Sequence, residues 1–252
     1  MDGMEPYNNN ITFSIDLPKK GVLNGNLLFA AILSKMAYNR NDYVNVTFSD
    51  GIITPFDFET VKGIRFENSD VVAIIFTGSQ TWKDWKSNLD IRKVKTHVGD
   101  VHSGFLNSIA SIECNTVPFT RPSGENVELT SIKITVLPCI ESLVTSNKPI
   151  VFGGHSRGGA QAQLVAALLH EKYKNVHSVY AFGSPKLGGP EWASWWKQAK
   201  LPLYNIRYGN DIVTEFPPSS FREAIWAFYC LLISACRLVT RKIFARFKRQ
   251  AK

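Results

Sequence analysis

The chain has 252 residues, 44% of them hydrophobic, and carries a formal net charge of +8. This length suits one α/β domain with a sizeable core, and no internal repeat or low-complexity segment is evident. Seven of the eight net charges fall in residues 237–252, which contain no acidic side chain, so the rest of the chain carries only +1. This distribution argues against a nucleic-acid-binding body and favours a basic segment that meets an anionic surface.

The first residues contain neither a basic stretch nor an apolar one, so no secretory signal is expected. The four cysteines, Cys114, Cys139, Cys230 and Cys236, have neither CxxC nor zinc-ligand spacing. They are interpreted as reduced thiols, which predicts a cytoplasmic protein.

The first half of the chain begins with an irregular arm, residues 1–25. An apolar helix is predicted at 26–38, followed by strands at 45–48, 61–66 and 71–76. Residues 71–76 are six uninterrupted apolar residues, which is typical of a central parallel strand buried on both faces.

The middle of the chain gives weaker signals. Residues 80–90 place Trp82 and Trp85 among charged residues, and two interpretations are open: buried tryptophans, or a lid over a lipid-accepting pocket. A helix is expected to begin within residues 101–105 and to continue to about 112, and residues 114–124 are expected to form a loop. A helix disturbed by Pro138 is predicted at 129–145.

The second half alternates between strands and helices. Strands are predicted at 150–152, 177–182 and 203–207, and helices at 160–170 and 190–200. This alternation predicts an α/β fold with a mainly parallel central sheet and helices on both faces.

The motif Gly154-His155-Ser156-Arg157-Gly158 lies between a predicted strand and a predicted helix. Strand, Gly-x-Ser-x-Gly and helix together form the nucleophile-elbow pattern. The serine of an elbow occupies a strained turn, and glycines at the flanking positions avoid collisions with the neighbouring strand and helix. The turn would expose the Ser156 hydroxyl and direct the Arg157 backbone N–H toward an oxyanion. The alternative is a glycine-rich turn without chemistry.

Five motifs follow one another along the chain: Thr77-Gly78-Ser79, Val101-His102-Ser103-Gly104-Phe105, Gly154-His155-Ser156-Arg157-Gly158-Gly159, Phe182-Gly183-Ser184-Pro185, and Asn210-Asp211-Ile212-Val213 with Pro217-Pro218. In this order the chain resembles the class 3 lipase family, the fungal-type triacylglycerol lipases of the α/β-hydrolase fold. The resemblance covers roughly residues 26–218, which we expect to form a lipase-like domain.

The resemblance implies a role for each of four residues. Ser156 would be the nucleophile, and Asp211, at the end of a late strand, would be the acid of the catalytic triad. Ser79 matches the family's oxyanion residue after the first long strand. Arg157 would complete the oxyanion hole through its backbone N–H. No metal or other cofactor is expected.

The catalytic base is the missing part of this pattern. A serine hydroxyl is a weak nucleophile without a base, and in this fold the histidine follows the acid. All five histidines, at positions 97, 102, 155, 170 and 177, precede Asp211. Three explanations are open: a truncated or frame-shifted lipase, a lipase-like protein that no longer hydrolyses, or a recruited upstream histidine, with His97 the least unfavourable. His102 and His155 look structural, and His155 is too close to Ser156 on a tight turn to face it.

Residues 219–252 form an apolar and then basic segment. Residues 224–236 carry no charge, and as a helix they would span about 20 Å, short of a hydrocarbon core of about 30 Å. Beyond them, apolar residues at 239, 243, 244 and 247 share one helical face and basic residues another. Residues 224–252 therefore predict a helical tail that binds an anionic membrane surface. The alternative is a last helix packed on the domain.

Two functions remain open at this point. The first is a serine ester hydrolase acting on acyl lipids, triacylglycerol or phospholipid, in lipid metabolism. The second is a catalytically impaired protein of the same fold that binds lipid or membrane. A nucleic-acid partner is not expected, because the charge lies in one segment without a recognition motif.

Overall fold

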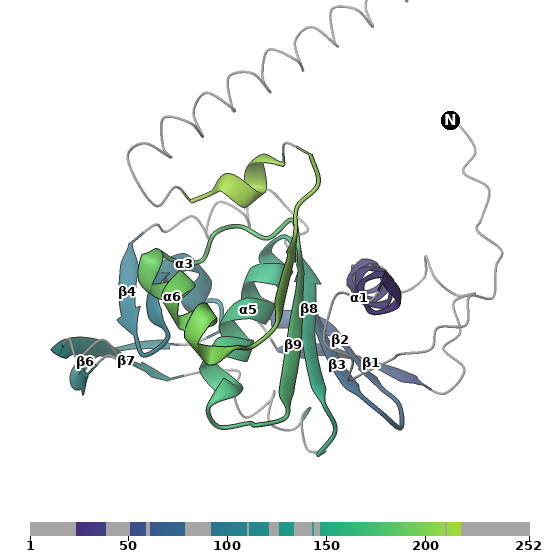
Figure 1. Cartoon of the computed structure of the whole chain (residues 1–252), viewed down its shortest axis with the longest axis horizontal. Coiled ribbons are helices and arrows are strands. Elements are labelled where there is room, and N and C mark those ends of the chain that lie inside the picture. The colour runs from purple at the N-terminus through teal and green to yellow at the C-terminus, as the bar shows by residue number, and fades with distance from the viewer. Residues whose placement is uncertain are drawn as a thin grey trace, which may run out of the picture.

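The computed structural model describes residues 24–38, 51–58, 61–78, 92–109, 111–120, 126–133, 143, 147–209 and 211–217. Within these residues, a central six-stranded sheet has the strand order β1-β2-β3-β8-β9-β10. Helix α1 covers one face of the sheet, and α5 and α6 lie on the other (Figure 1). The predicted mainly parallel sheet with helices on both faces is therefore confirmed.

The parallel half of the sheet brings four strand ends to one edge. Strands β3 (Val72–Phe76), β8 (Ile150–His155), β9 (Val176–Phe182) and β10 (Leu203–Ile206) run parallel to one another. Phe76 pairs with Gly154, His155 with Phe182, and Phe182 with Ile206. The loops that follow these strands therefore leave the sheet side by side, the usual place for a ligand site in such folds.

The other half is antiparallel. Strands β1 (Ile52–Phe58) and β2 (Val61–Glu67) form a hairpin, and β2 pairs antiparallel with β3. The apolar run at 71–76 thus has one parallel and one antiparallel neighbour. Strand β1 was not predicted, because Pro55 and Asp57 interrupt its apolar pattern.

The core has two layers, one on each face of the sheet. Helix α1 (Asn24–Met36) packs with Ala73 and Ile75 of β3, whereas α5 (Arg157–His170) packs with Ile74 and Phe76 of the same strand. Alternate side chains of a strand point to opposite faces, so a strand covered on both sides is apolar throughout. All five residues of β3 are buried, as predicted.

The connection from β3 to β8 differs from the prediction. It contains the hairpin β4 (Lys93–Thr96) and β5 (Gly99–His102), the short helix α3 (Ser103–Leu106), and the hairpin β6 (Ser111–Thr120) and β7 (Asn126–Lys133). The helix predicted at 101–112 is four residues long, and the loop predicted at 114–124 is mostly strand. The helix predicted from 129 is wrong over 129–133, which belong to β7 and pair with β6 across a hairpin.

The remaining predicted elements after residue 150 are confirmed, including α6 (Pro190–Ala199), and a short 3₁₀ helix, η2 (Ile212–Glu215), follows β10. The predicted strand at 45–48, the lid at 80–90 and the tail at 219–252 lie outside the described residues, as does nearly all of the arm at 1–25. In the part of the chain that is described, no helix has the length and apolar character needed to cross a membrane.

Candidate active site

Ser156 occupies the sharp turn between β8 and α5. Its backbone has φ 55° and ψ −125°, outside the region that non-glycine residues normally adopt. A Cβ atom at Gly154 would lie 2.5 Å from the carbonyl carbon of Gly158, and one at Gly158 would lie 2.1 Å from the carbonyl oxygen of Phe76. The two glycines are therefore required by close backbone packing, and the geometry is that of a nucleophile elbow.

Backbone hydrogen bonds hold this turn against the sheet. The N–H of Ser156 donates to the carbonyl of Phe182 at 2.8 Å, and its carbonyl accepts from Ala160 at 3.2 Å in the first turn of α5. Arg157 is the first residue of that helix. The backbone N–H of Arg157 therefore lies in the first turn of the helix, directly after Ser156.

Asp211 lies immediately before η2, just beyond the end of β10. Its side chain accepts a hydrogen bond from the Val213 backbone N–H at 3.0 Å and so caps that helix. A Cβ atom at Gly183 would lie 2.9 Å from Asp211 Oδ2. Since Gly183 follows Phe182, whose carbonyl binds Ser156, the serine and the carboxylate converge on the same loop.

Tyr38, two residues beyond α1, connects that helix to the elbow. Its hydroxyl lies 2.9 Å from His155 Nδ1 and 3.4 Å from the His155 carbonyl oxygen. A Cβ atom at Gly78 would lie 1.9 Å from the same hydroxyl, so the turn after β3 also meets it. Burial raises the pKa of Tyr38 to about 12, while a hydrogen bond from the Gly78 backbone and the charge of Arg157 act in the opposite direction. Tyr38 therefore remains a neutral hydroxyl that joins three segments of the site.

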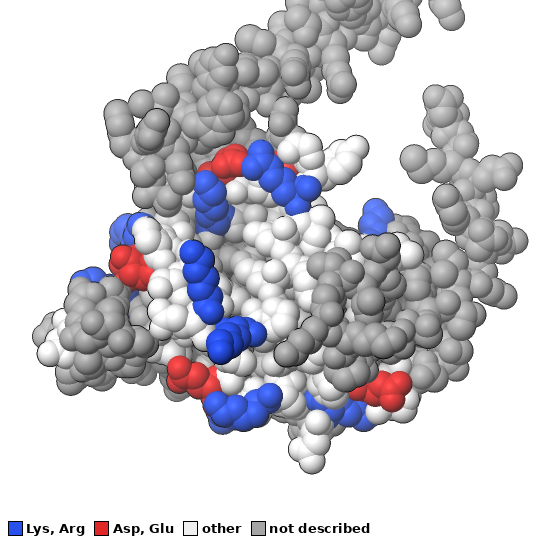
Figure 2. All heavy atoms as spheres, in the orientation of Figure 1, with Lys and Arg blue, Asp and Glu red and all other residues white. Residues whose placement is uncertain are grey.

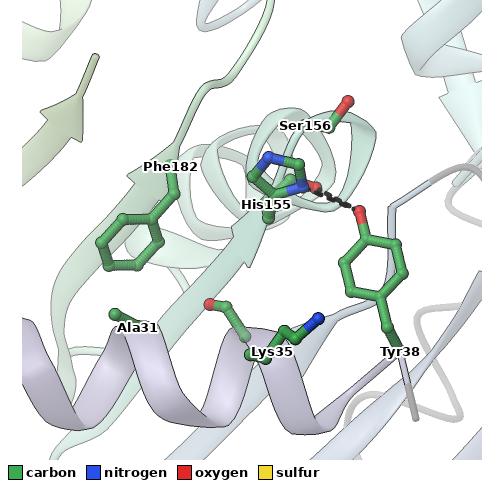
Figure 3. Close-up of a pocket in the computed structure, with 7 residues that line it drawn as sticks. Ala31, Lys35, Tyr38, His155, Ser156 and Phe182 are labelled. Carbon is green, nitrogen blue, oxygen red and sulfur yellow. Dashed lines mark hydrogen bonds between the residues drawn. The ribbon is translucent and has the colours of Figure 1, made fainter. Parts of the chain in front are cut away.

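The imidazole of His155 lies on the side of Tyr38 and Asp211. Its pKa is lowered, first by burial and then by the ammonium of Lys35, and the carboxylate of Asp211 opposes this shift. Figure 3 shows the imidazole directed toward Tyr38 while the Ser156 hydroxyl points away from it. His155 is thus not aimed to take the proton of Ser156, as its position on the turn predicted.

A pocket of about 510 Å³ opens beside the elbow. Its described lining comes from α1, the elbow and the end of β9: Ala31, Ser34, Lys35, Tyr38, His155, Ser156 and Phe182. The volume falls in the range of small-molecule sites, and the nucleophile candidate forms part of the wall. Figure 3 shows Ala31 and Phe182 on one side of this space and Tyr38 on the other.

The other four histidines do not complete a triad. The carboxylate of Glu171 affects the pKa of His97, which places His97 near the end of α5 opposite Ser156, about 20 Å away along the helix. His170 packs on Trp195 at that same end, and His177 lies at the start of β9, whereas Ser156 contacts its end. His102 is 1% exposed and is not among the lining residues of the pocket. The hypothesis that His97 serves as the base is therefore wrong for this geometry.

The sequence hypotheses thus stand as follows. Ser156, Arg157 and Asp211 come together at one sheet edge, while Ser79 lies outside the described residues, directly after Gly78. Sequence reasoning missed Tyr38 and Lys35, whose only signal was their position at the end of an apolar helix. No cluster of three metal-ligating side chains occurs in the described ranges.

Comparison with known proteins agrees with this geometry. The family model "Lipase (class 3)" matches residues 73–221. The lipase of Rhizopus niveus is 26% identical over 168 residues, which are 63% of this chain and 38% of that protein. A triacylglycerol lipase of Arabidopsis thaliana is 27% identical over 180 residues, 60% of this chain and 35% of that protein. The chain spans about two fifths of the length of the curated relatives it matches.

Solved structures show the same fold. A complex of Rhizomucor miehei lipase with its propeptide superposes with a TM-score of 0.58 at 20% identity, covering 77% of this chain and 61% of that one. The lipase of Rhizopus microsporus var. chinensis gives 0.57 at 20% identity, covering 77% and 68%. The elbow, the converging aspartate and the match over residues 73–221 lead to one assignment: the chain belongs to the class 3 lipase family.

Proposed function

We propose that the protein is a serine ester hydrolase of lipid metabolism that acts on acyl lipids, triacylglycerol or phospholipid. The observation that carries this proposal is the strained Ser156 at an elbow that lines a pocket. A backbone cost of about 1–3 kcal/mol persists only where the surrounding structure imposes it, and such strain concentrates at functional sites. Related proteins described as lipases, from Rhizopus niveus and Rhizomucor miehei, support the reaction class.

In the proposed reaction, the Ser156 oxygen attacks the ester carbonyl carbon and the serine proton passes, through a base, to the departing alcohol. Water then hydrolyses the acyl-serine to a free acid and restores the serine hydroxyl. The N–H of Arg157, together with Ser79, would stabilise the oxyanion, and Asp211 would support the positive charge on the base. The base itself is left unassigned: the His155 imidazole does not point toward the Ser156 hydroxyl (Figure 3), and none of the other four histidines is among the described lining residues of the pocket.

The test is covalent labelling with a fluorophosphonate ester, which requires an activated serine. We expect wild type to be labelled and Ser156→Ala not to be. Ser194→Ala is the matched control: it removes an exposed serine on α6, whose hydroxyl accepts from Gln198, and should label like wild type. Equal labelling of wild type and Ser156→Ala would overturn the proposal.

A second candidate function is favoured by the orientation of His155. It is a catalytically impaired protein of the same fold that binds lipid or membrane. A serine triad without its base keeps about 10³–10⁴-fold rate over water but loses roughly 10⁶-fold, so impairment would be nearly complete. Folded wild-type protein that binds acyl lipid, yet neither labels nor hydrolyses, would support this candidate over the first.

We further propose a cytoplasmic protein that meets an anionic membrane through residues 224–252. The support is the apolar and then basic sequence of that segment. Lys and Arg side chains are also spread over the face that carries α6 and β10 (Figure 2). Residues 219–252 fused to a fluorescent carrier should sediment with anionic vesicles and not with neutral ones. A fusion that stays in solution with both would contradict this proposal.

A further inference from the structure

One face of α1 forms a wall of the pocket. Residues 31, 34 and 35 share one stripe of the helix, with i, i+3, i+4 spacing, and all three line the pocket together with Tyr38, which lies two residues beyond the helix. The adjacent stripe, which includes Phe29, Ala30 and Leu33, packs against the sheet. Packing therefore fixes the orientation of α1, and the chemistry of its second stripe is presented to whatever occupies the pocket.

Lys35 supplies the positive charge of this wall. It is exposed, and in the described part of the chain no carboxylate forms an ion pair with it. Its charge reaches the imidazole of His155, whose pKa it lowers. No acidic side chain occurs among the described lining residues. Figure 3 shows Tyr38 reaching toward His155 at the elbow, with the Lys35 side chain beside α1 on the side of Tyr38.

Ser34, beside Lys35, is a buried hydroxyl without a partner. The residue lines the pocket but is only 3% exposed, and among the described residues its buried Oγ has no hydrogen-bond partner. A buried hydroxyl that forms no hydrogen bond costs free energy, whereas an incoming acceptor would satisfy it. Lys35 and Ser34 therefore place an ammonium and a hydroxyl donor among the residues that line the pocket containing Ser156.

We propose that Lys35 and Ser34 bind a phosphate group of the substrate, so that the preferred esters are acyl esters of glycerol phosphate and not neutral acylglycerols. This inference rests on the proposed function and names its substrate class. Phosphate offers acceptor oxygens to both donors, and charge-assisted hydrogen bonds are the strong ones. Ala31 and Phe182 leave apolar wall for the acyl chain.

The experiment measures binding instead of turnover. In the Ser156→Ala background, isothermal titration compares hexanoylglycerol with hexanoylglycerol 3-phosphate, two esters that differ by one phosphate. We expect the phosphorylated ester to bind about tenfold tighter or more, and Lys35→Gln to remove most of that difference. Lys35→Arg should retain it in large part, because the positive charge remains. Ser34→Ala should weaken phosphate-ester binding several-fold without lowering stability, because this hydroxyl has no partner to lose.

Lys197→Gln is the matched control. Lys197 is an exposed lysine on α6, across the sheet from α1, and its replacement should leave both affinities unchanged. Equal affinity for the two esters, or equal effects of Lys35→Gln and Lys197→Gln, would overturn the proposal. Inorganic phosphate that binds as tightly as the phosphorylated ester would also overturn it, since the acyl part would then contribute nothing. If binding depends on Lys35 but wild type hydrolyses neither ester, the hydrolase proposal fails while the anion site stands.

Discussion

At the scale of single residues, Gly183 and Gly209 share a left-handed backbone and differ only in their surroundings. Both have φ 55°, but a Cβ atom at Gly183 would lie 2.9 Å from Asp211 Oδ2, whereas one at Gly209 would meet nothing within 4 Å. Substitutions at Gly183 and Gly209 therefore distinguish the effect of backbone strain from the effect of displacing the Asp211 carboxylate.

We expect Gly183→Ala and Gly209→Ala each to lower the free energy of unfolding by about 1–2 kcal/mol through left-handed strain. Only Gly183→Ala should also slow labelling of Ser156 by a fluorophosphonate, because its methyl group displaces the Asp211 carboxylate. Urea unfolding and the labelling rate measure the two effects. Equal labelling of both variants would show that the position of Asp211 does not matter to Ser156.

Individual site residues could be predicted from the sequence where a motif constrains the backbone. Ser156 was found because the glycines of the Gly-x-Ser-x-Gly motif indicate a tight turn between a strand and a helix, whereas Asp211 was assigned through the resemblance to the lipase family. Tyr38 and Lys35 were not found, because their importance depends on which stripe of α1 faces the sheet, and an apolar helix does not reveal this by itself. The orientation of His155 was predictable from its neighbour on the turn.

At the scale of elements, Asp211 has two separable functions. It caps η2 through the Val213 N–H at 3.0 Å, and its charge raises the pKa of His155. Asparagine caps a helix about as well as aspartate but carries no charge, whereas alanine does neither.

Asp211→Asn should therefore leave the free energy of unfolding within about 0.5 kcal/mol of wild type, whereas Asp211→Ala should lower it by about 1 kcal/mol. In both variants the pKa of His155 should fall further, since the charge that raised it is gone. Thermal unfolding and an NMR titration of the His155 imidazole measure these quantities. An unchanged pKa in both variants would contradict the proximity of the two side chains.

The buried strands of the central sheet and the helices packed on it could be predicted from the sequence. The β6–β7 hairpin outside that sheet could not. The run at 71–76 is apolar throughout because both faces of its strand are buried. After residue 150, short apolar strands alternate with helix-forming segments, and this alternation is also visible in the sequence. Strands β6 and β7 pair with each other outside the central sheet, and their sequences were interpreted as a loop over 114–124 and as a helix from 129. Their pairing is decided by a neighbour across the hairpin, which local propensity does not specify.

At the scale of the whole molecule, three histidines couple folding to pH. Burial lowers the pKa values of His97, His155 and His177, so the folded state binds fewer protons than the unfolded chain near its ordinary histidine pKa of about 6.5. Stability rises with pH wherever the unfolded state binds more protons. The contribution of these histidines is thus complete above about 6.5 and is lost as the pH falls below it.

We expect the free energy of unfolding to decrease between pH 7.5 and 5.0, measured by urea unfolding at several pH values. His97→Gln should make this decrease smaller, because one of the buried imidazoles no longer titrates. Glu67→Gln is the control: hydrogen bonds and charge from Lys148 and Arg65 lower the pKa of Glu67 below its ordinary value of 4.5, so its titration lies at more acidic pH. A free energy of unfolding that stays constant across the interval would mean that the three imidazoles are as readily protonated in the folded protein as in the unfolded chain.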